Sequence, residues 1–306
     1  MADVLLIECR QRSGNDPVTT MFNKILCPID FSDISMTTLR EAAKLARKDH
    51  ALLYVMHVEF VPMGNLVEIA QDVTLSTEPG KLRLEQATRK LLAGVRHEVV
   101  VQFGRPAELI EKAAKDLDVD LVVMATHGRT GIHRLFLGSV AEHVVRRSRR
   151  SVLSFGPGTA IRRLKKILCP VAFDPNSIAA LRFGWRLARE YGASMSLLHV
   201  VPVAFEPSEV PVEPSPPEWE RDARTELETV AAQNLGTNVE FKLVARRGNP
   251  ASAILEVEKE LRPDLIVMAT HGRTGLSHLV LGSVAERTVR ESTVPVLTIR
   301  GQNGVA

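Results

Sequence analysis

The sequence has few cysteines and few aromatic residues, and it lacks a long apolar run. Its three cysteines among 306 residues, Cys9, Cys27 and Cys169, form neither a CxxC pair nor a zinc-ligand spacing, which excludes a disulfide-stapled or zinc-stabilised fold. No apolar run approaches the ~18 residues that a membrane-spanning helix needs. Met1–Arg12 lacks the basic and long apolar parts of a secretion signal. We therefore expect a protein of the reducing cytoplasm that does not enter a membrane.

An excess of charge of one sign is also missing. Lys and Arg total 39 and Asp and Glu total 36, so the formal net charge is +3. This balance argues against nucleic acid as a partner of the whole chain. Two basic clusters, Arg146–Arg150 and Arg162–Lys166, have almost no aromatic residues among them. We interpret them as solvated segments, the first at a helix C-terminus where cations suit the dipole, and keep nucleic-acid or anionic-lipid contact as the less favoured alternative.

The chain contains a long internal repeat. Lys24–Pro28 recurs as Lys166–Pro170, and Met124–Gly131 recurs letter for letter as Met268–Gly275. Between 124–146 and 268–290, 17 of 23 positions are identical. A period of about 143 residues is too long for a solenoid and indicates a duplicated domain.

The repeat sets the domain boundaries. We place the first domain at residues 22–156 and the second at 163–301, because Gly156–Ala160 has the glycine and proline content of a linker. Residues 1–21 match nothing in the second half, so we expect an N-terminal extension ahead of the fold or a mobile arm.

Each copy alternates short apolar runs with helical patterns. In the first copy we expect strands at 24–29, 51–58, 98–103, 120–125 and 151–155, and helices at 33–49, 79–95, 105–118 and 138–149. Continuous apolar runs are typical of strands buried on both faces of a parallel sheet. Ser32 or Asp33 is expected to cap the first helix. In the second copy, Asp174, which is followed by Pro175, is expected to cap the corresponding helix. The alternation predicts a doubly wound α/β sheet whose ligands bind beyond the carboxyl ends of the strands.

The segment after the fourth strand is the strongest candidate for a binding site. Each Ala-Thr-His-Gly-Arg-Thr-Gly is followed by Gly-Ser, at Gly138-Ser139 and Gly282-Ser283, where a helix opens. Glycine lets the backbone approach a ligand, and we expect the N–H groups of Gly138, Ser139 and Val140 to be free to hold an anion. The alternative is that the glycines only form turns and that Ser139 is a helix cap. The loop is neither GxxxxGK[ST] nor GxGxxG.

Three of these features resemble the universal stress protein family: the strand end KILCPIDFS at Lys24–Ser32, the His57-Val58 pair, and the loop pattern (G/A)xxGx(9)G(S/T). The resemblance extends over residues 22–300, and the family pattern occurs once in each copy, as in family members with two tandem domains. The family's nucleotide-binding branch has G-2x-G-9x-G-(S/T); here the first glycine is Ala125 or Ala269, while both later glycines are kept. The resemblance implies two tandem domains, each an open, doubly wound, five-stranded parallel sheet of the Rossmann-like, adenine-nucleotide alpha-hydrolase-like type.

The resemblance also implies ATP as the ligand, with any Mg²⁺ carried by its phosphates. The matching positions of the first domain are Pro28, Asp30, Val58 and Met124 around the adenosine, and Ala125, Gly128, Gly138, Ser139 and Val140 toward the ribose and phosphates. Those of the second domain are Pro170, Val200, Met268, Ala269, Gly272, Gly282, Ser283 and Val284. Asp30 aligns with Ala172, so we predict that the first site binds ATP more tightly.

The resulting functional hypothesis is an ATP-binding stress-response or signalling module with at most slow hydrolysis, because no residue stands out as a general base. His127 and His271 could touch phosphate or polarise a water, although a structural role is favoured for them, as for His57 and His199. No cluster of carboxylates suggests a metal cage. One alternative is a scaffold of the same fold that binds no nucleotide; another is an ATP-consuming enzyme whose catalytic residue the sequence does not reveal.

The last strands of the two copies suggest a further partner relationship. Residues 151–155 and 295–299 are apolar edge runs, and in the family the fifth strands of two domains pair. We therefore predict an intrachain pseudo-dimer. A further homodimer is left open.

Overall fold

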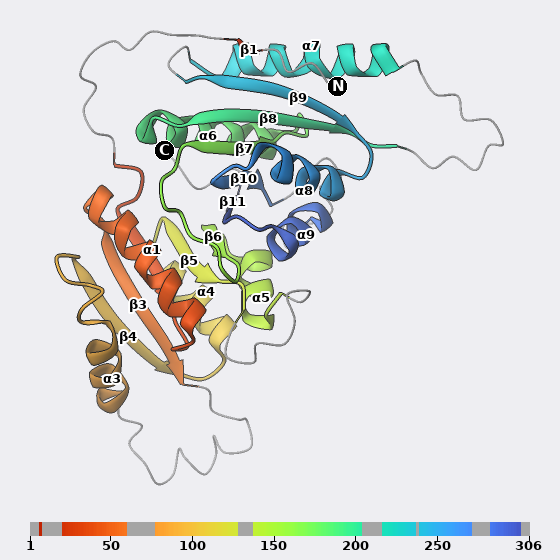
Figure 1. Cartoon of the computed structure of the whole chain (residues 1–306). Helices are drawn as coiled ribbons and strands as arrows, with labels where there is room; N and C mark the ends of the chain where they lie inside the picture. The colour runs from red at the N-terminus through yellow and green to blue at the C-terminus, as the bar shows by residue number, and fades with distance from the viewer. Residues whose placement is uncertain are drawn as a thin grey trace. The chain divides into compact units, whose positions relative to one another are not determined.

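The computed structural model describes residues 6–7, 20–59, 77–127, 137–203, 216–236, 239–270 and 282–300. The chain folds as two compact units, Thr20–Ala160 and Ile161–Ala306, the latter together with Met1–Thr19. We call them the first and the second domain. Within each, strands and helices alternate along the chain (Figure 1).

The first domain is a five-stranded parallel sheet in the order β6-β5-β2-β3-β4. Its strands are β2 (Lys24–Pro28), β3 (Leu52–Glu59), β4 (His97–Phe103), β5 (Leu121–Ala125) and β6 (Ser151–Phe155). Its helices are α1 (Asp33–Asp49), α3 (Glu78–Thr88), α4 (Pro106–Asp116) and α5 (Ser139–Arg147). Because parallel crossovers are right-handed, this order places α1 and α3 on one face and α4 and α5 on the other.

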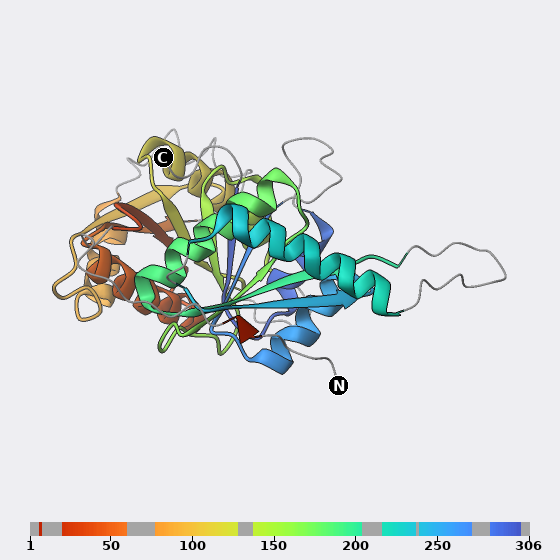
Figure 2. The same ribbon diagram turned by 90° about the horizontal axis from the view of Figure 1, so that it is seen from above.

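The second domain repeats this architecture, with its parallel strands in the order β9-β8-β7-β10-β11. The strands are β7 (Lys166–Pro170), β8 (Ser194–Val201), β9 (Phe241–Arg247), β10 (Leu265–Ala269) and β11 (Val296–Ile299). The helices are α6 (Pro175–Tyr191), α7 (Pro216–Asn234), α8 (Pro250–Leu261) and α9 (Ser283–Glu291), and Figure 2 shows α7 lying along the strands of this domain. The predicted doubly wound α/β fold is confirmed in both copies.

A short strand from the start of the chain joins the second sheet. β1 (Leu6–Ile7) pairs antiparallel with β9, with Leu6 opposite Lys242 and Ile7 opposite Phe241. Two residues of the expected N-terminal extension therefore contribute an edge strand to the second domain.

The central strands are apolar along their length because helices cover both of their faces. Ile25, Leu26 and Cys27 of β2 are fully buried, as are Leu168 and Cys169 of β7. Burial raises the pKa of the Cys169 thiol to about 12, and it raises the pKa of Cys27 in the same direction. Both thiols therefore stay protonated inside the folded domains.

The helix starts follow the sequence signals. Ser32 caps α1, and its hydroxyl accepts the Ser35 N–H at 3.3 Å. Asp174 caps α6 by accepting the N–H groups of Asn176 and Ser177, with Pro175 at the first helical position. Both predicted caps are confirmed. Among the described helices, none is long and apolar enough to cross a membrane.

The helix expected at 79–95 is shorter than predicted. α3 ends at Thr88, whose hydroxyl donates to the carbonyl of Leu84 at 2.7 Å. The chain continues in turns to Gly94, which has a φ of 73°. Leu92 and Val95 lie in or directly after these turns, and both are buried. Their spacing continues the apolar pattern of a helix, although the backbone is not helical there.

Candidate functional site

Each domain has a cavity at the carboxyl ends of its central strands. β3 lies on one side of β2 and β5 on the other, so the helices that follow β2 and β5 run to opposite faces of the sheet. Such a reversal of strand order opens a crevice where α/β proteins bind ligands. The first cavity measures about 450 Å³ and the second about 240 Å³. Only the first lies within the range of roughly 300–1,000 Å³ that is usual for small-molecule sites.

The structure brings the described candidate residues together in these two cavities. The first is lined by Pro28, Asp30, Val58, Met124, Ala125, Gly138, Ser139 and Val140. The second is lined by Pro170, Ala172, Val200, Met268, Ala269, Gly282, Ser283 and Val284. Gly128, Gly272 and His271 lie outside the described residues.

Gly138 brings the start of α5 close to the end of β5. Its N–H donates to the carbonyl of Thr126 at 2.8 Å, and a Cβ added to it would lie 3.0 Å from that same oxygen. The expectation that this N–H is free for an anion is therefore wrong, and Gly282 makes the equivalent bond to Thr270 at 2.8 Å. Ser139 is not the helix cap either, because Gly138 holds that position. Glycine is needed here for close backbone approach.

Three other N–H groups remain at the start of α5, those of Ser139, Val140 and Ala141. The first bond of the helix runs from the Glu142 N–H to the Gly138 carbonyl at 2.8 Å. The N–H groups of Ser139 and Val140 precede it, so they have no acceptor within the helix. Both residues line the cavity, at the helix end that carries a positive partial charge. This end of the cavity suits an oxyanion.

Thr126 ties this helix start to the sheet. Its N–H donates to the carbonyl of Phe155 at 2.9 Å, and its own carbonyl accepts the Gly138 N–H. Thr270 does the same in the second domain, with bonds to Ile299 at 3.2 Å and Gly282 at 2.8 Å. The position of the helix start is thus set by backbone bonds that both domains share.

Asp30 stands at the opposite wall, where β2 ends. Its carboxylate accepts the Ser32 N–H at 3.0 Å and the Ser32 hydroxyl at 2.5 Å. The next residue, Phe31, has a φ of 63°, a strained conformation for an aromatic residue. Its ring packs on His57 at 4.6 Å between centroids, and His57 Nδ1 donates to the Ile29 carbonyl at 2.8 Å. These contacts fix the turn that presents Asp30 to the cavity.

His57 and His199 have equivalent positions. His199 Nδ1 donates to the Val171 carbonyl at 2.7 Å, and its ring stacks on Phe173, which has a φ of 59°. Both histidines also line their cavities. They support the strand-end turn, as expected for structural residues, and additionally form part of the cavity wall.

Glu59 is a cavity residue that the sequence motifs do not single out. It is the last residue of β3 and lines the first cavity, with its carboxylate 3.8 Å from His57 Nε2. In the second domain Val201 takes its place, after the same His-Val pair. Two carboxylates, Asp30 and Glu59, thus line the first cavity, whereas the described lining of the second has none. The sequence contains this difference, because His-Val is followed by Glu in the first copy and by Val in the second. Only the strand order shows that the end of β3 lies beside β2.

His127 borders the first cavity. Its Nδ1 lies 2.8 Å from the Thr126 hydroxyl, which lies 3.3 Å from the Phe155 carbonyl and donates to it. Thr126 therefore links the His127 ring to the end of β6. Nε2 is buried without a hydrogen-bond partner. Among the residues that the structure describes, no group of three or more His, Cys, Asp or Glu could hold a metal ion.

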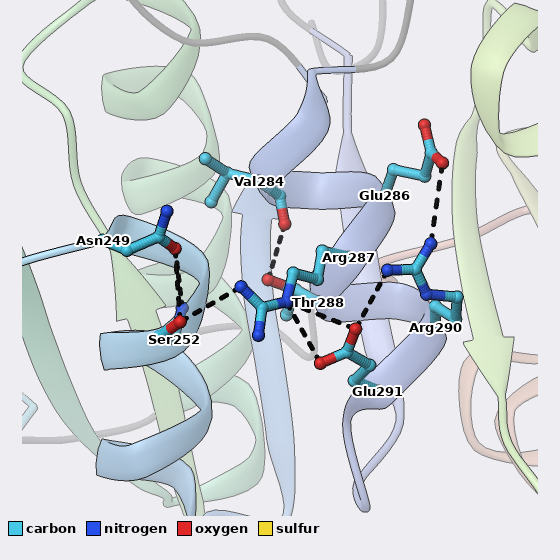
Figure 3. A network of polar contacts seen from close by, with 8 residues as sticks. All are labelled: Asn249, Ser252, Val284, Glu286, Arg287, Thr288, Arg290 and Glu291. Atoms are coloured by element: carbon cyan, nitrogen blue, oxygen red, sulfur yellow. Dashed lines mark hydrogen bonds and ion pairs between the residues drawn. The ribbon is translucent and has the colours of Figure 1, made fainter. Parts of the chain in front are cut away.

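A charged network joins two helices whose first residues line the second cavity, α8 and α9 (Figure 3). Arg287 donates to the Ser252 hydroxyl at 3.1 Å and to Glu291 at 3.1 Å, and Arg290 donates to Glu291 at 2.9 Å. The hydrogen bond from Arg290, together with Arg287, holds the pKa of Glu291 below its ordinary value. In the first domain the corresponding helices, α4 and α5, are joined by a His143–Glu111 contact of 3.4 Å.

Comparisons with known proteins agree with this architecture. The sequence profile described as the Universal stress protein family matches residues 21–155 and again 163–300. A universal stress protein from Mycolicibacterium smegmatis is 27% identical over 293 residues, which span 90% of this chain and 96% of the relative. The crystal structure of a universal stress protein from Archaeoglobus fulgidus DSM 4304 has the same fold over 92% of this chain and 97% of its own, with a TM-score of 0.66 and 21% identity. A universal stress protein crystallised in complex with cAMP is 25% identical, covers 44% of this chain and 97% of its own, and has a TM-score of 0.35.

Proposed function

The chain belongs to the universal stress protein family, with two tandem copies of the domain, and from this premise we propose that its first domain binds an adenine nucleotide, ATP, as a stress-response or signalling module. One observation carries the proposal: a single cavity collects all eight described residues that the sequence motifs single out in that domain.

The surfaces that line the cavity suit the groups of a nucleotide. Pro28, Val58 and Met124 offer apolar walls for a flat base. The Asp30 carboxylate can accept hydrogen bonds from sugar hydroxyls. The N–H groups of Ser139 and Val140 lie at the helix N-terminus that suits phosphate oxygens. The described lining contains no Lys or Arg, so Mg²⁺ arriving with the nucleotide would neutralise part of the phosphate charge.

We infer binding with at most slow hydrolysis. The Asp30 carboxylate already accepts hydrogen bonds from Ser32, and Glu59 lies beside His57, so neither stands out as a general base. A scaffold that binds no nucleotide is the alternative, and Ala172 with the smaller cavity favours it for the second domain. Location in the cytoplasm and pairing of the two domains through their fifth strands stay predictions.

Asp30→Ala tests the proposal. A hydrogen bond to a charged group contributes about 1.5–3 kcal/mol, so we expect ATP affinity to fall by roughly 10- to 100-fold. Calorimetric titrations with ATP, AMP and cAMP would measure this and rank the three ligands. Asp33→Ala is the matched control, because it removes the same charge from an exposed position in α1 that does not line the cavity.

A second measurement is independent of any variant. Freshly purified protein is denatured, and released nucleotides are identified by mass; we expect an adenine nucleotide. No heat with any of the three ligands and no released nucleotide would reject the proposal in favour of the scaffold.

A further inference from the structure

The second cavity has kept the anion-binding end of the first and lost its carboxylates. Ala172 stands where the first domain has Asp30, and Val201 where it has Glu59. Among the described residues that line it, there is no Asp, Glu, Lys or Arg. A ligand that fills this cavity therefore meets no charged side chain on these walls.

Two of the few polar side chains of the second cavity are already engaged within the protein. The Ser177 hydroxyl donates to the Asp174 carbonyl at 3.0 Å, and His199 Nδ1 donates to the Val171 carbonyl at 2.7 Å. A hydroxylated sugar placed here would lose its water and find no carboxylate to replace it, which costs free energy.

The remaining wall is apolar and comes from four different elements. Leu198 and Val200 belong to β8, Ile254 to α8, Met268 to β10 and Val284 to α9. These side chains offer favourable burial to an apolar ligand body. The volume of about 240 Å³, against about 450 Å³ in the first cavity, restricts that body to a small one.

The start of α9 contributes backbone donors to this cavity. The first bond of α9 runs from the Glu286 N–H to the Gly282 carbonyl at 3.0 Å. The N–H groups of Ser283 and Val284 precede it and have no acceptor within the helix. A cavity with apolar walls and one such end matches a molecule with an apolar body and a single oxyanion head.

We propose that the second domain's cavity binds a small amphiphilic anion, an acyl or alkyl chain that ends in one phosphate or carboxylate, in preference to a nucleotide. This goes beyond the proposed nucleotide site, because it concerns the other cavity. The two domains would then sense two ligand classes: a hydroxylated nucleotide in the first and a short amphiphile in the second.

Calorimetric titration of the full chain with octyl phosphate tests the inference, with octanoate as the carboxylate counterpart. We expect one saturable site that excess ATP does not empty. Each methylene removed, in heptyl and hexyl phosphate, should weaken binding about fourfold, which corresponds to the usual contribution of a buried methylene. The separate fragments, 1-octanol and inorganic phosphate, should each bind at least tenfold more weakly than octyl phosphate.

Ala172→Asp locates the site. It installs the first domain's carboxylate beside the apolar body, so octyl phosphate affinity should fall at least tenfold. Asn176→Asp is the matched control, because it adds the same charge at the start of α6, outside the cavity lining. Should Ala172→Asp fail to fold beside Asp174, Val200→Thr keeps the test open: it puts a hydroxyl into the wall at nearly constant shape and should weaken binding severalfold.

Several results would overturn the inference. They are an absence of saturable binding, displacement of octyl phosphate by equimolar ATP, equal affinity for 1-octanol or for phosphate alone, and unchanged affinity in a folded Ala172→Asp. If the octyl phosphate affinity fell in Asp30→Ala and not in Ala172→Asp, the binding site would lie in the first domain. Since ATP binding is measured separately, failure here leaves the nucleotide proposal standing, and the reverse also holds.

Discussion

The two domains share a fold and an almost identical loop sequence, yet their cavities differ. The hydrogen bonds that place the helix start, Thr126 to Gly138 and Thr270 to Gly282, are the same in both. The side chains on the opposite wall are not: Asp30 and Glu59 correspond to Ala172 and Val201. The backbone bonds that position the start of the helix have therefore been kept after duplication, while these side chains of the cavity lining have diverged.

The contacts that hold the surrounding helices differ as well. In the second domain the carboxylate of Glu258, which is 3% exposed, accepts the N–H and the hydroxyl of Thr293 at 2.7 and 2.5 Å. The first domain has Ala114 and Arg149 at these two positions. Near the corresponding turn, it has a more exposed ion pair, Arg150–Asp118 at 2.6 Å. The second domain thus has a buried carboxylate where the first has a partly exposed ion pair.

The largest effect is expected from Gly138→Val. Because even a Cβ would lie 3.0 Å from the Thr126 carbonyl, a branched side chain has to push the start of α5 away from β5. We expect ATP affinity to drop by more than about 100-fold, or ~2.7 kcal/mol, as measured by calorimetry. The same change at Gly282 should remove octyl phosphate binding by the second cavity. Full ATP affinity in a folded Gly138→Val chain would show that the helix start does not hold the phosphates.

Glu258→Ala tests the difference in stability. It removes two hydrogen bonds to a charged group, each contributing at least about 1.5 kcal/mol, so the free energy of unfolding of the second domain should fall by ~3 kcal/mol. Cys27 and Cys169 report on the two domains separately, because each is fully buried and reacts only when its domain opens. In a Cys9→Ala background, thiol labelling of Cys169 should accelerate roughly 100-fold while Cys27 is unchanged.

Two controls sharpen this experiment. Glu258→Gln keeps one acceptor and should have an intermediate effect. Arg150→Ala removes an ion pair whose Asp118 side chain is 75% exposed, so it should lower the first domain's stability by less than ~1 kcal/mol. Equal acceleration of both thiols in Glu258→Ala would mean that the domains open as one unit. This result would contradict an effect of Glu258 that is confined to the second domain.

The extent to which sequence predicts this molecule depends on how local each feature is. The strands and the helix caps at Ser32 and Asp174 follow from nearby residues, and the duplication supplies each pattern twice. The bond from Gly138 to Thr126 crosses a loop, so nothing in the spacing reveals that this N–H is already used. Glu59 is missed for a similar reason: it joins the cavity only through the strand order. Thr88 ends its helix early although the apolar spacing continues.

The smallest expected effect is on the stability of the second domain at low pH. Arg290 and Arg287 hold the pKa of Glu291 below its ordinary value, so ionised Glu291 stabilises the fold above its unfolded pKa of about 4.3, and this stabilisation is lost as the pH falls through the lowered folded value. Arg147 takes its place in the first domain. Both tryptophans, Trp185 and Trp219, lie in the second domain, so urea unfolding followed by tryptophan fluorescence reports on that domain. Between pH 6 and pH 3.5, the second domain should lose less stability in Glu291→Gln than in the unaltered chain. The difference should be only a few tenths of a kcal/mol, because Glu291 and its arginine partners are partly exposed and screened. An unaltered acid limb in Glu291→Gln would mean that the network of Arg287, Arg290 and Glu291 does not contribute to the acid sensitivity of the second domain.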